Sequence, residues 1–238
     1  MIMRTHIRFV SLLAIAIPFG LAGCFKLSRK SPTLQLYALG GESAGAVSTT
    51  TSGALTAGRG PLTIGLRRLE LASYLSVPAV MIRRGANQLV VSEFHRWGGH
   101  LDQGINRAVG TYLADSPAVG AVDVAPWPSR VRHNFIVQLR VTRFEGVADS
   151  AASNGRVHVL AGWDIVRPLD GIVLVRGSTD DRSGAFRVGD YSGLVTGLDA
   201  ALSRVARDIG ACLARFPNDS TPPASCGSAT GAEGSSGK

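Results

Sequence analysis

The sequence is poor in the residues on which several classes of protein depend. Of its 238 residues only 18% are charged, 6% are aromatic and three are cysteine. The net charge of +8 comes from arginine, because lysine occurs only at Lys26, Lys30 and Lys238. The arginines are not clustered: Arg67-Arg68 and Arg83-Arg84 are isolated pairs. Nucleic-acid binding needs grouped cations and interleaved aromatic rings, so we expect no nucleic-acid partner.

Motifs for ATP hydrolysis and metal binding are also missing. There is no G-x-x-x-x-G-K-[ST], Cys-x-x-Cys or His-Glu-x-x-His in the chain, which excludes a P-loop ATPase and the common zinc motifs. His95 and His100 would lie on different faces of a helix, and His133 and His158 are expected to be solvent-facing or hydrogen-bonded strand residues. Asp180-Asp181 is predicted to be a solvated turn. We therefore predict no metal, no catalytic residue and no cofactor apart from a covalent lipid.

One short match to an esterase motif stands against this expectation. Gly41-Glu42-Ser43-Ala44-Gly45 fits the G-x-S-x-G elbow, which places its serine between a strand and a helix. A run rich in Ser, Thr and Gly follows Ser43, and a single predicted strand precedes it. Such a run is a poor helix, and one strand is too few to build the sheet of a hydrolase. We expect the protein not to be an enzyme.

The amino terminus has the layout of an export signal. Arg4 and Arg8 precede an apolar run over Phe9–Phe19, which is shorter than the roughly 20 residues of a membrane-spanning helix. The run ends in Leu21-Ala22-Gly23-Cys24, which matches the lipobox of bacterial lipoproteins. In a lipobox the cysteine thiol receives a diacylglycerol, and the signal peptidase cleaves before it. We predict a signal peptide over 1–23 and lipidation at Cys24, with acyl chains such as palmitate.

Several acyl chains give lasting membrane attachment without a spanning helix. Residues 24–33 would then be a lipidated tether, in which Lys26, Arg29 and Lys30 either contact anionic headgroups or serve as soluble linker residues. Phe25 occupies the position where an Asp favours retention in the inner membrane. We therefore predict a lipid-anchored protein in the outer membrane that faces the periplasm.

Cys212 and Cys226 remain once Cys24 is lipidated. In an oxidising compartment they can form a disulfide, which would close a loop of about 15 residues and contribute roughly 3 kcal/mol on the chain-entropy model. Two free thiols are the alternative, and the sequence leaves both open.

In the exported part, apolar and polar residues alternate as they do in strands, and two segments have the spacing of amphipathic helices. Alternation of Phe135, Val137, Leu139 and Val141 indicates a half-buried strand. Further strands are predicted over 34–39, 62–71, 80–84, 88–92, 119–124, 157–166 and 171–177, and helices over about 97–114 and 191–216. The fold class is α+β: a single domain, mainly an antiparallel sheet packed by two amphipathic helices. Its predicted bounds are 34–216, with a flexible loop over 40–61 and a disordered tail over 217–238.

Several local segments resemble the PqiC-like family of ABC-type transport auxiliary lipoproteins. The first is Leu66–Leu75, which contains Tyr74 and Leu75, followed by Ala79–Arg84 with Arg83. The second is Glu93–Leu101, with Arg96 and Trp97. Third come Arg143-Phe144-Glu145, Trp163-Asp164-Ile165 and the closing helix. Ala72 stands where the family usually has Pro, and Ser76-Val77 replace its usual Asp-Arg.

The resemblance implies a non-catalytic subunit of a lipid-transport system. In such a system an MCE-domain tunnel protein works with ABC permease components and crosses the periplasm, and the lipoprotein links this tunnel to the outer membrane and supports envelope integrity. Family members are expected to form homo-oligomers, with a ring as one arrangement. Tyr74, Leu75, Arg83, Arg96, Trp97 and Trp163 would be structural residues or partner contacts. The alternative function is a stand-alone lipoprotein that binds a lipid or other apolar ligand between sheet and helices.

Overall fold

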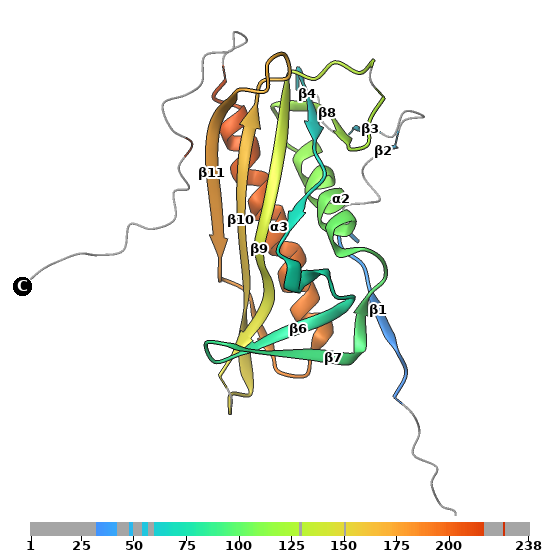
Figure 1. Ribbon diagram of the computed structural model, residues 1–238, viewed down its shortest axis with the longest axis vertical. Coiled ribbons are helices and arrows are strands. Elements are labelled where there is room, and N and C mark those ends of the chain that lie inside the picture. The colour runs from blue at the N-terminus through green and yellow to red at the C-terminus, as the bar shows by residue number, and fades with distance from the viewer. Residues whose placement is uncertain are drawn as a thin grey trace, which may run out of the picture. The chain divides into compact units, whose positions relative to one another are not determined.

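The computed structural model describes residues 32–41, 48–49, 54–56, 60–128, 130–149, 151–216 and 226. The predicted signal peptide, Cys24, Ser43 and the predicted tail apart from Cys226 lie outside these residues. One twelve-stranded sheet and two α-helices form the domain (Figure 1). The α+β class is confirmed. The strands are β1 (Gln35–Tyr37), β2 (Ser48–Thr49), β3 (Ala54–Thr56), β4 (Leu62–Leu66), β5 (Glu70–Leu71), β6 (Ala79–Arg84), β7 (Gln88–Trp97), β8 (Val119–Val124), β9 (Phe135–Ala148), β10 (Asn154–Val166), β11 (Val173–Asp181) and β12 (Ala185–Arg187).

The sheet is organised around the long strand β9. One edge of β9 pairs along its whole length with β10. Its other edge pairs in succession with β4, β5 and β6, all parallel to it. Strand β10 continues the sheet through β11 and β12, which share its far edge. Beyond β4 lie β8, β3 and β2, and beyond β6 lie β7 and β1.

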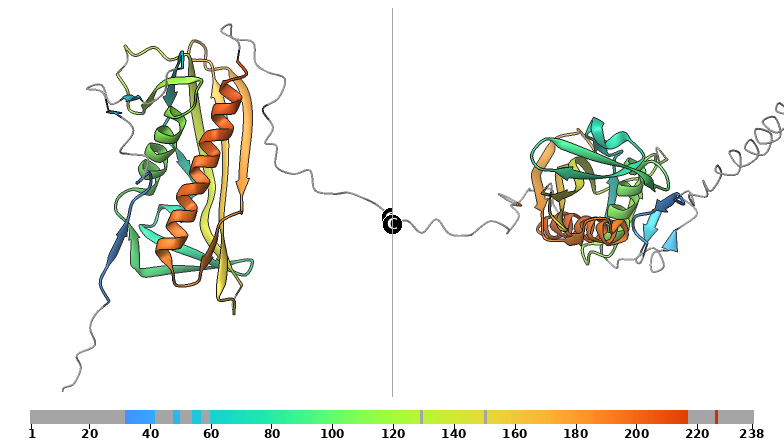
Figure 2. Two further views of the ribbon diagram at one scale, coloured as in Figure 1. Left: turned by 180° about the vertical axis from the view of Figure 1, so that it is seen from behind. Right: turned by 90° about the horizontal axis from the view of Figure 1, so that it is seen from below.

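Both helices, α2 (Leu101–Ala114) and α3 (Tyr191–Leu213), contact each other and the sheet. Seen from behind, α3 runs across β9, β10 and β11 (Figure 2). Its N-cap is Asp190, whose carboxylate accepts a hydrogen bond from the Gly193 amide, and its periodic apolar stripe is fully buried. The core between helices and sheet includes the completely buried residues Ile64, Leu75, Ile105, Leu113, Leu194, Leu198 and Leu202.

The predicted direction of the strands needs correction. The sheet is mixed, since the pairs β1–β7, β4–β8, β4–β9, β5–β9 and β6–β9 are parallel. Helix α2 lies between β7 and β8 in the chain, and β8 then pairs with the much earlier strand β4. Alternation along a strand reports which face is buried, but it carries no information on the partner's direction.

Several predicted boundaries also differ. The first helix begins at Leu101 rather than near Trp97, because β7 continues to Trp97 and pairs with β1. The predicted strand over 62–71 is broken between β4 and β5. The loop predicted over 40–61 contains β2 and β3, and β3 pairs with β8. Asp180-Asp181 is not a solvated turn: both residues end β11, and Asp181 is buried.

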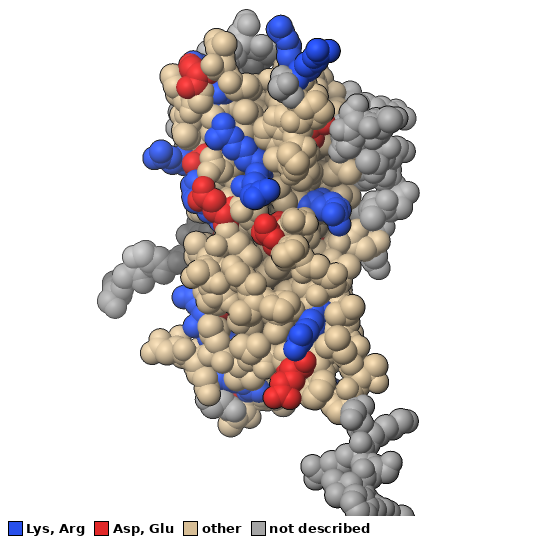
Figure 3. All heavy atoms as spheres, turned by 45° about the vertical axis from the view of Figure 1, so that its right-hand side comes forward, with Lys and Arg blue, Asp and Glu red and all other residues tan. Residues whose placement is uncertain are grey.

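The outer face of the sheet, away from α3, carries interleaved charges. Arg140 on β9 makes two hydrogen bonds of 2.9 and 3.0 Å to the carboxylate of Asp164 on β10. Further along, Asp180 accepts hydrogen bonds from Arg182 and lies 3.0 Å from His158 Nε2. Figure 3 shows Lys and Arg atoms scattered among Asp and Glu atoms on one side of the molecule. Arg140 and Arg182 are therefore each paired with an acid on this face.

Candidate functional site

Three of the segments that carry the family resemblance meet at one buried carboxylate. Glu145 on β9 is 0% exposed. Its Oε1 accepts a hydrogen bond of 2.5 Å from Arg83 Nε on β6 and one of 3.2 Å from Arg143 Nη1. Its Oε2 lies 3.1 Å from Arg83 Nη2 and 3.0 Å from the hydroxyl of Tyr74, in the 3-10 turn η3 (Ser73–Ser76). The structure thus joins Tyr74 and Arg83 through Glu145.

The electrostatics of this cluster are those of a structural ion pair. Hydrogen bonding to Glu145 raises the pKa of Arg83 above its ordinary value, against the effect of burial. Burial raises the pKa of Tyr74, and the negative charge of Glu145 raises it further. Tyr74 therefore stays a neutral donor and Arg83 a cation at physiological pH. The hydrogen bonds fix η3 and β6 against β9.

The other singled-out residues divide between core and surface. Leu75 is fully buried in η3, and Trp163 is 1% exposed on β10. Trp97 is also buried, with its ring centroid 5.7 Å from that of Phe144. Arg96 alone of this set is exposed, on β7. The two tryptophans and Leu75 therefore act through packing, whereas Arg96 takes no part in the core.

The histidines are dispersed. His133 lies 2.9 Å from the carboxylate of Asp123, and both side chains are buried. His95 Nδ1 lies 3.0 Å from the Tyr37 hydroxyl, and its ring stacks on Tyr191 at 3.9 Å. Among the described residues no group of three or more His, Cys, Asp or Glu is arranged to hold a metal ion.

Cys212 and Cys226 form a disulfide in the structure, with a Cα–Cα distance of 5.3 Å. Cys212 lies near the end of α3, and both sulfur-bearing residues are buried. The bridge therefore attaches a residue of the predicted tail to the last helix. Of the helices that the structure describes, none combines the length and the apolar character of a membrane span.

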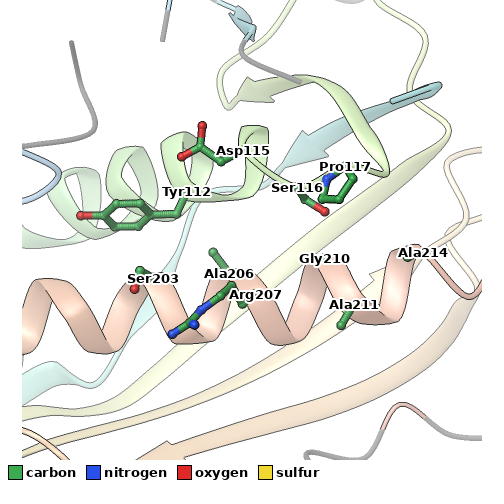
Figure 4. Close-up of a pocket in the computed structure, with 10 residues that line it drawn as sticks. All are labelled: Tyr112, Asp115, Ser116, Pro117, Ser203, Ala206, Arg207, Gly210, Ala211 and Ala214. Carbon is green, nitrogen blue, oxygen red and sulfur yellow. The ribbon is translucent and has the colours of Figure 1, made fainter. Parts of the chain in front are cut away.

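A groove runs along the seam between α2 and α3 (Figure 4). Its larger part has a volume of about 550 Å³ and lies between Tyr112 and the turn at Ser116 on one side and α3 on the other. Small residues of α3, among them Ala206 and Gly210, form its floor. A second hollow of about 430 Å³ adjoins it, and Tyr112 and Ser203 line both.

Asp199 lies beside the groove and forms hydrogen bonds that connect the elements around it. Its carboxylate accepts a hydrogen bond of 2.6 Å from the Tyr112 hydroxyl and one of 2.8 Å from the Gly40 amide. Helix α2, helix α3 and the segment after β1 therefore meet at one side chain. The groove lies outside the helix layer rather than between sheet and helices, where buried side chains pack. Sequence patterns gave no sign of it, because its walls come from the solvent side of both helices.

Exposed apolar side chains gather in two separate places on the described part of the chain. The first group lies on or next to β1, β6 and β7, and the second lies at the hairpin between β10 and β11. In the second group Leu169 is 91% exposed. The two groups comprise Leu34, Leu36, Val77, Val90, Val91 and Phe94, and then Leu169, Ile172 and Val173. Both groups lie outside the apolar core that the sheet and the helices bury.

Comparison with known proteins identifies the family. Residues 37–210 match the family described as the ABC-type transport auxiliary lipoprotein component. No curated protein matches the sequence. A solved structure from Xanthomonas campestris is similar at 15% identity with a TM-score of 0.53, covering 77% of this chain and 93% of that one. An uncharacterized protein is similar at 16% identity with a TM-score of 0.50, covering 63% and 90%. The likeness to these structures shows the fold, and the family match spans most of the sequence, so the chain belongs to the ABC-type transport auxiliary lipoprotein family.

Proposed function

We propose that the protein is a non-catalytic, lipid-anchored subunit of an ABC transport system of the MCE type. In this proposal the lipid on Cys24 holds it in the outer membrane, and the folded domain faces the periplasm. There it binds an MCE-domain tunnel protein and ABC permease components, links the tunnel to the outer membrane and supports envelope integrity. The family match over residues 37–210 is the observation that carries the proposal.

Two further features support a binding role. The polar cluster around Glu145 uses its hydrogen-bonding groups within the fold, so it stabilises the domain and does not present a reactive group. Exposed apolar side chains gather in two groups, as expected of a protein that contacts other components of an assembly. The proposal also includes self-association into a homo-oligomer, with a ring as one form.

Affinity purification from native membranes tests the partners. A carboxy-terminally tagged chain should recover an MCE-domain protein and a permease after mild solubilisation. Cys24→Ala is the matched control for the anchor, because the described domain begins after this residue and its core does not include it. The variant should leave the outer-membrane fraction while its domain stays folded. Recovery of neither partner would overturn the transport assignment, and persistence of Cys24→Ala in the outer membrane would overturn the anchor.

The groove between α2 and α3 favours a second candidate, a stand-alone lipoprotein that binds an apolar ligand. Its volume of about 550 Å³ lies within the range of small-molecule sites. Native mass spectrometry of the full mature chain should then show a lipid on a monomer. Ala211→Trp, which would fill the groove, should release this lipid, and Ser192→Trp on an exposed position of the same helix should retain it. A lipid-free oligomer would exclude this candidate.

A further inference from the structure

The chain enters the domain beside an apolar surface. Leu34 is 50% exposed, Leu36 is 63% exposed and Phe94 is 38% exposed. Leu36 is paired with Arg96 in the parallel β1–β7 ladder, and Phe94 precedes Arg96 by two positions. Residues two apart in a strand project from the same face. We call Leu34, Leu36, Phe94 and Arg96 the outer face of β1 and β7.

The opposite face of the same strands is the one that packs on the domain. Gln35 and Tyr37 alternate with Leu36, and Tyr37 pairs with Trp97, which is buried. The Tyr37 hydroxyl contacts His95, whose ring stacks on Tyr191 at the start of α3. The outer face therefore points away from α3. A sheet face turned to water normally carries polar side chains, whereas this one carries two leucines and a phenylalanine.

Chain length places this face within reach of a membrane. Leu34 follows Cys24 by ten residues, and ten residues extend over at most about 36 Å. A lipid attached to Cys24 would therefore keep the outer face within that distance of the bilayer. Since the leucines lie closer to the anchor along the chain than any other described apolar surface, the bilayer is the apolar phase most readily available to them.

The local charges suit an anionic lipid surface. No acidic residue occurs from Cys24 to Tyr37, and the tether carries Lys26, Arg29 and Lys30. From Ser73 to His100 the single acid is Glu93, and Arg96 is an exposed arginine of this stretch. Basic residues beside apolar ones are the composition that binds an interfacial layer of phosphates and acyl chains.

We propose that the outer face of β1 and β7 rests in the headgroup layer of the membrane that holds the lipid anchor. Leu34, Leu36 and Phe94 contact the acyl boundary, and Arg96 contacts lipid phosphates. This contact orients the domain, so that the β10–β11 hairpin points away from the membrane. The ten residue steps along β10 from Arg156 to Val166 place that hairpin roughly 33 Å further along the sheet. The inference rests on the proposed lipid attachment at Cys24.

Depth-dependent fluorescence quenching tests this contact. The mature lipidated chain is reconstituted into phosphatidylethanolamine and phosphatidylglycerol vesicles, with an environment-sensitive dye on Leu36→Cys or on Phe94→Cys. Leu169→Cys provides the matched control, because Leu169 is an exposed leucine at the β10–β11 hairpin. Nitroxide lipids should quench the dye at positions 36 and 94 roughly twofold, since an interfacial apolar face lies about 5–10 Å below the headgroups. The dye at position 169 should be unaffected.

Vesicle flotation separates the two parts of the inference. Protein that floats with an unquenched dye at position 36 would overturn the membrane contact and leave the anchor intact. Protein that does not float would overturn the anchor, and the contact with it. A dye that is shielded equally in detergent and in vesicles, without nitroxide quenching, would assign the face to a second copy of the chain and also refute the contact. Leu34→Ser with Leu36→Ser should abolish quenching at position 94.

Discussion

Arg83 and Arg143 both contact Glu145, but removing Arg83 should lower the stability of the protein more than removing Arg143. Arg83 makes two contacts with the carboxylate, at 2.5 and 3.1 Å, and its side chain is 14% exposed. Arg143 makes one at 3.2 Å, and its side chain is 38% exposed. Glu145 itself is completely buried. Arg83→Met would therefore leave the buried carboxylate with the partly exposed Arg143 and the neutral Tyr74 as its donors, whereas Arg143→Met would leave its main partner in place.

The magnitudes follow from the burial of each group. Removing one partner of a buried ion pair lowers the free energy of unfolding by about 3–5 kcal/mol. Because Arg143 still contacts Glu145 in Arg83→Met, we expect a loss near the lower end of this range. A partly exposed pair contributes at most about 1 kcal/mol, which we expect for Arg143→Met. For a domain of this size 1 kcal/mol corresponds to about 2–4 °C in Tm. The expected losses are therefore about 6–12 °C for Arg83→Met and about 2–4 °C for Arg143→Met.

Thermal and urea unfolding of the two variants beside the natural protein provide the measurement. Tyr74→Phe, which removes one donor to Glu145, should lie between natural protein and Arg83→Met with a loss of about 1 kcal/mol. Replacing both ends of the main pair, as in Arg83→Met with Glu145→Leu, should cost less than Arg83→Met alone. Equal losses in the two arginine variants, or a larger loss for Arg143→Met, would refute the assignment of Arg83 as the principal partner.

Three further predictions concern other parts of the domain. Gly177→Ala would place a Cβ inside the ring of Trp163, so we expect a loss of about 1–3 kcal/mol and altered tryptophan fluorescence, and an unchanged urea midpoint would contradict this packing. Burial lowers the pKa of His158 below 6.5. The unfolded chain therefore binds more protons than the folded one, and the free energy of unfolding falls as the pH drops below 6.5. Urea titrations on either side of this pH should show that His158→Gln flattens this dependence. Cys226→Ser should lower stability by roughly 3 kcal/mol. Reductant should reproduce this loss in the natural protein and have no effect on the variant, whereas freely alkylated Cys212 and Cys226 in the natural protein would refute the bridge.

The sequence predicted the elements whose periodicity is set by a single buried face. The stripe of α3 and the alternation from Phe135 to Val141 gave their faces correctly, because each turns one side to the core. The region after Gln88 was harder. Ser92 is buried while Val91 and Phe94 are exposed, and the β6–β7 register shifts within this stretch, so the alternation changes phase and no single period of two spans β7. A helix was therefore predicted too early, at Trp97.

The candidate sites required distances that sequence patterns do not contain. Arg83 and Glu145 were each singled out or quoted as part of a motif, but only the parallel pairing of β6 with β9 brings them together. Asp180-Asp181, which stands between Thr179 and Arg182, was predicted to be a solvated turn. Asp181 is instead buried and forms an ion pair with Arg204 of α3. Composition shows that a charge exists, but the partner that allows its burial comes from the fold.

The arrangement of β9 has a consequence for how the protein is made. Strands β4, β5 and β6 each pair with β9 along one edge, and β9 begins only at Phe135, long after Leu62. A chain synthesised amino terminus first presents these three strands with an open edge before their common partner has been made. Contacts so distant in sequence form slowly, and unpaired edges invite aggregation. The interval between the synthesis of Leu62 and that of β9 is therefore the stage at which this chain is most exposed to aggregation.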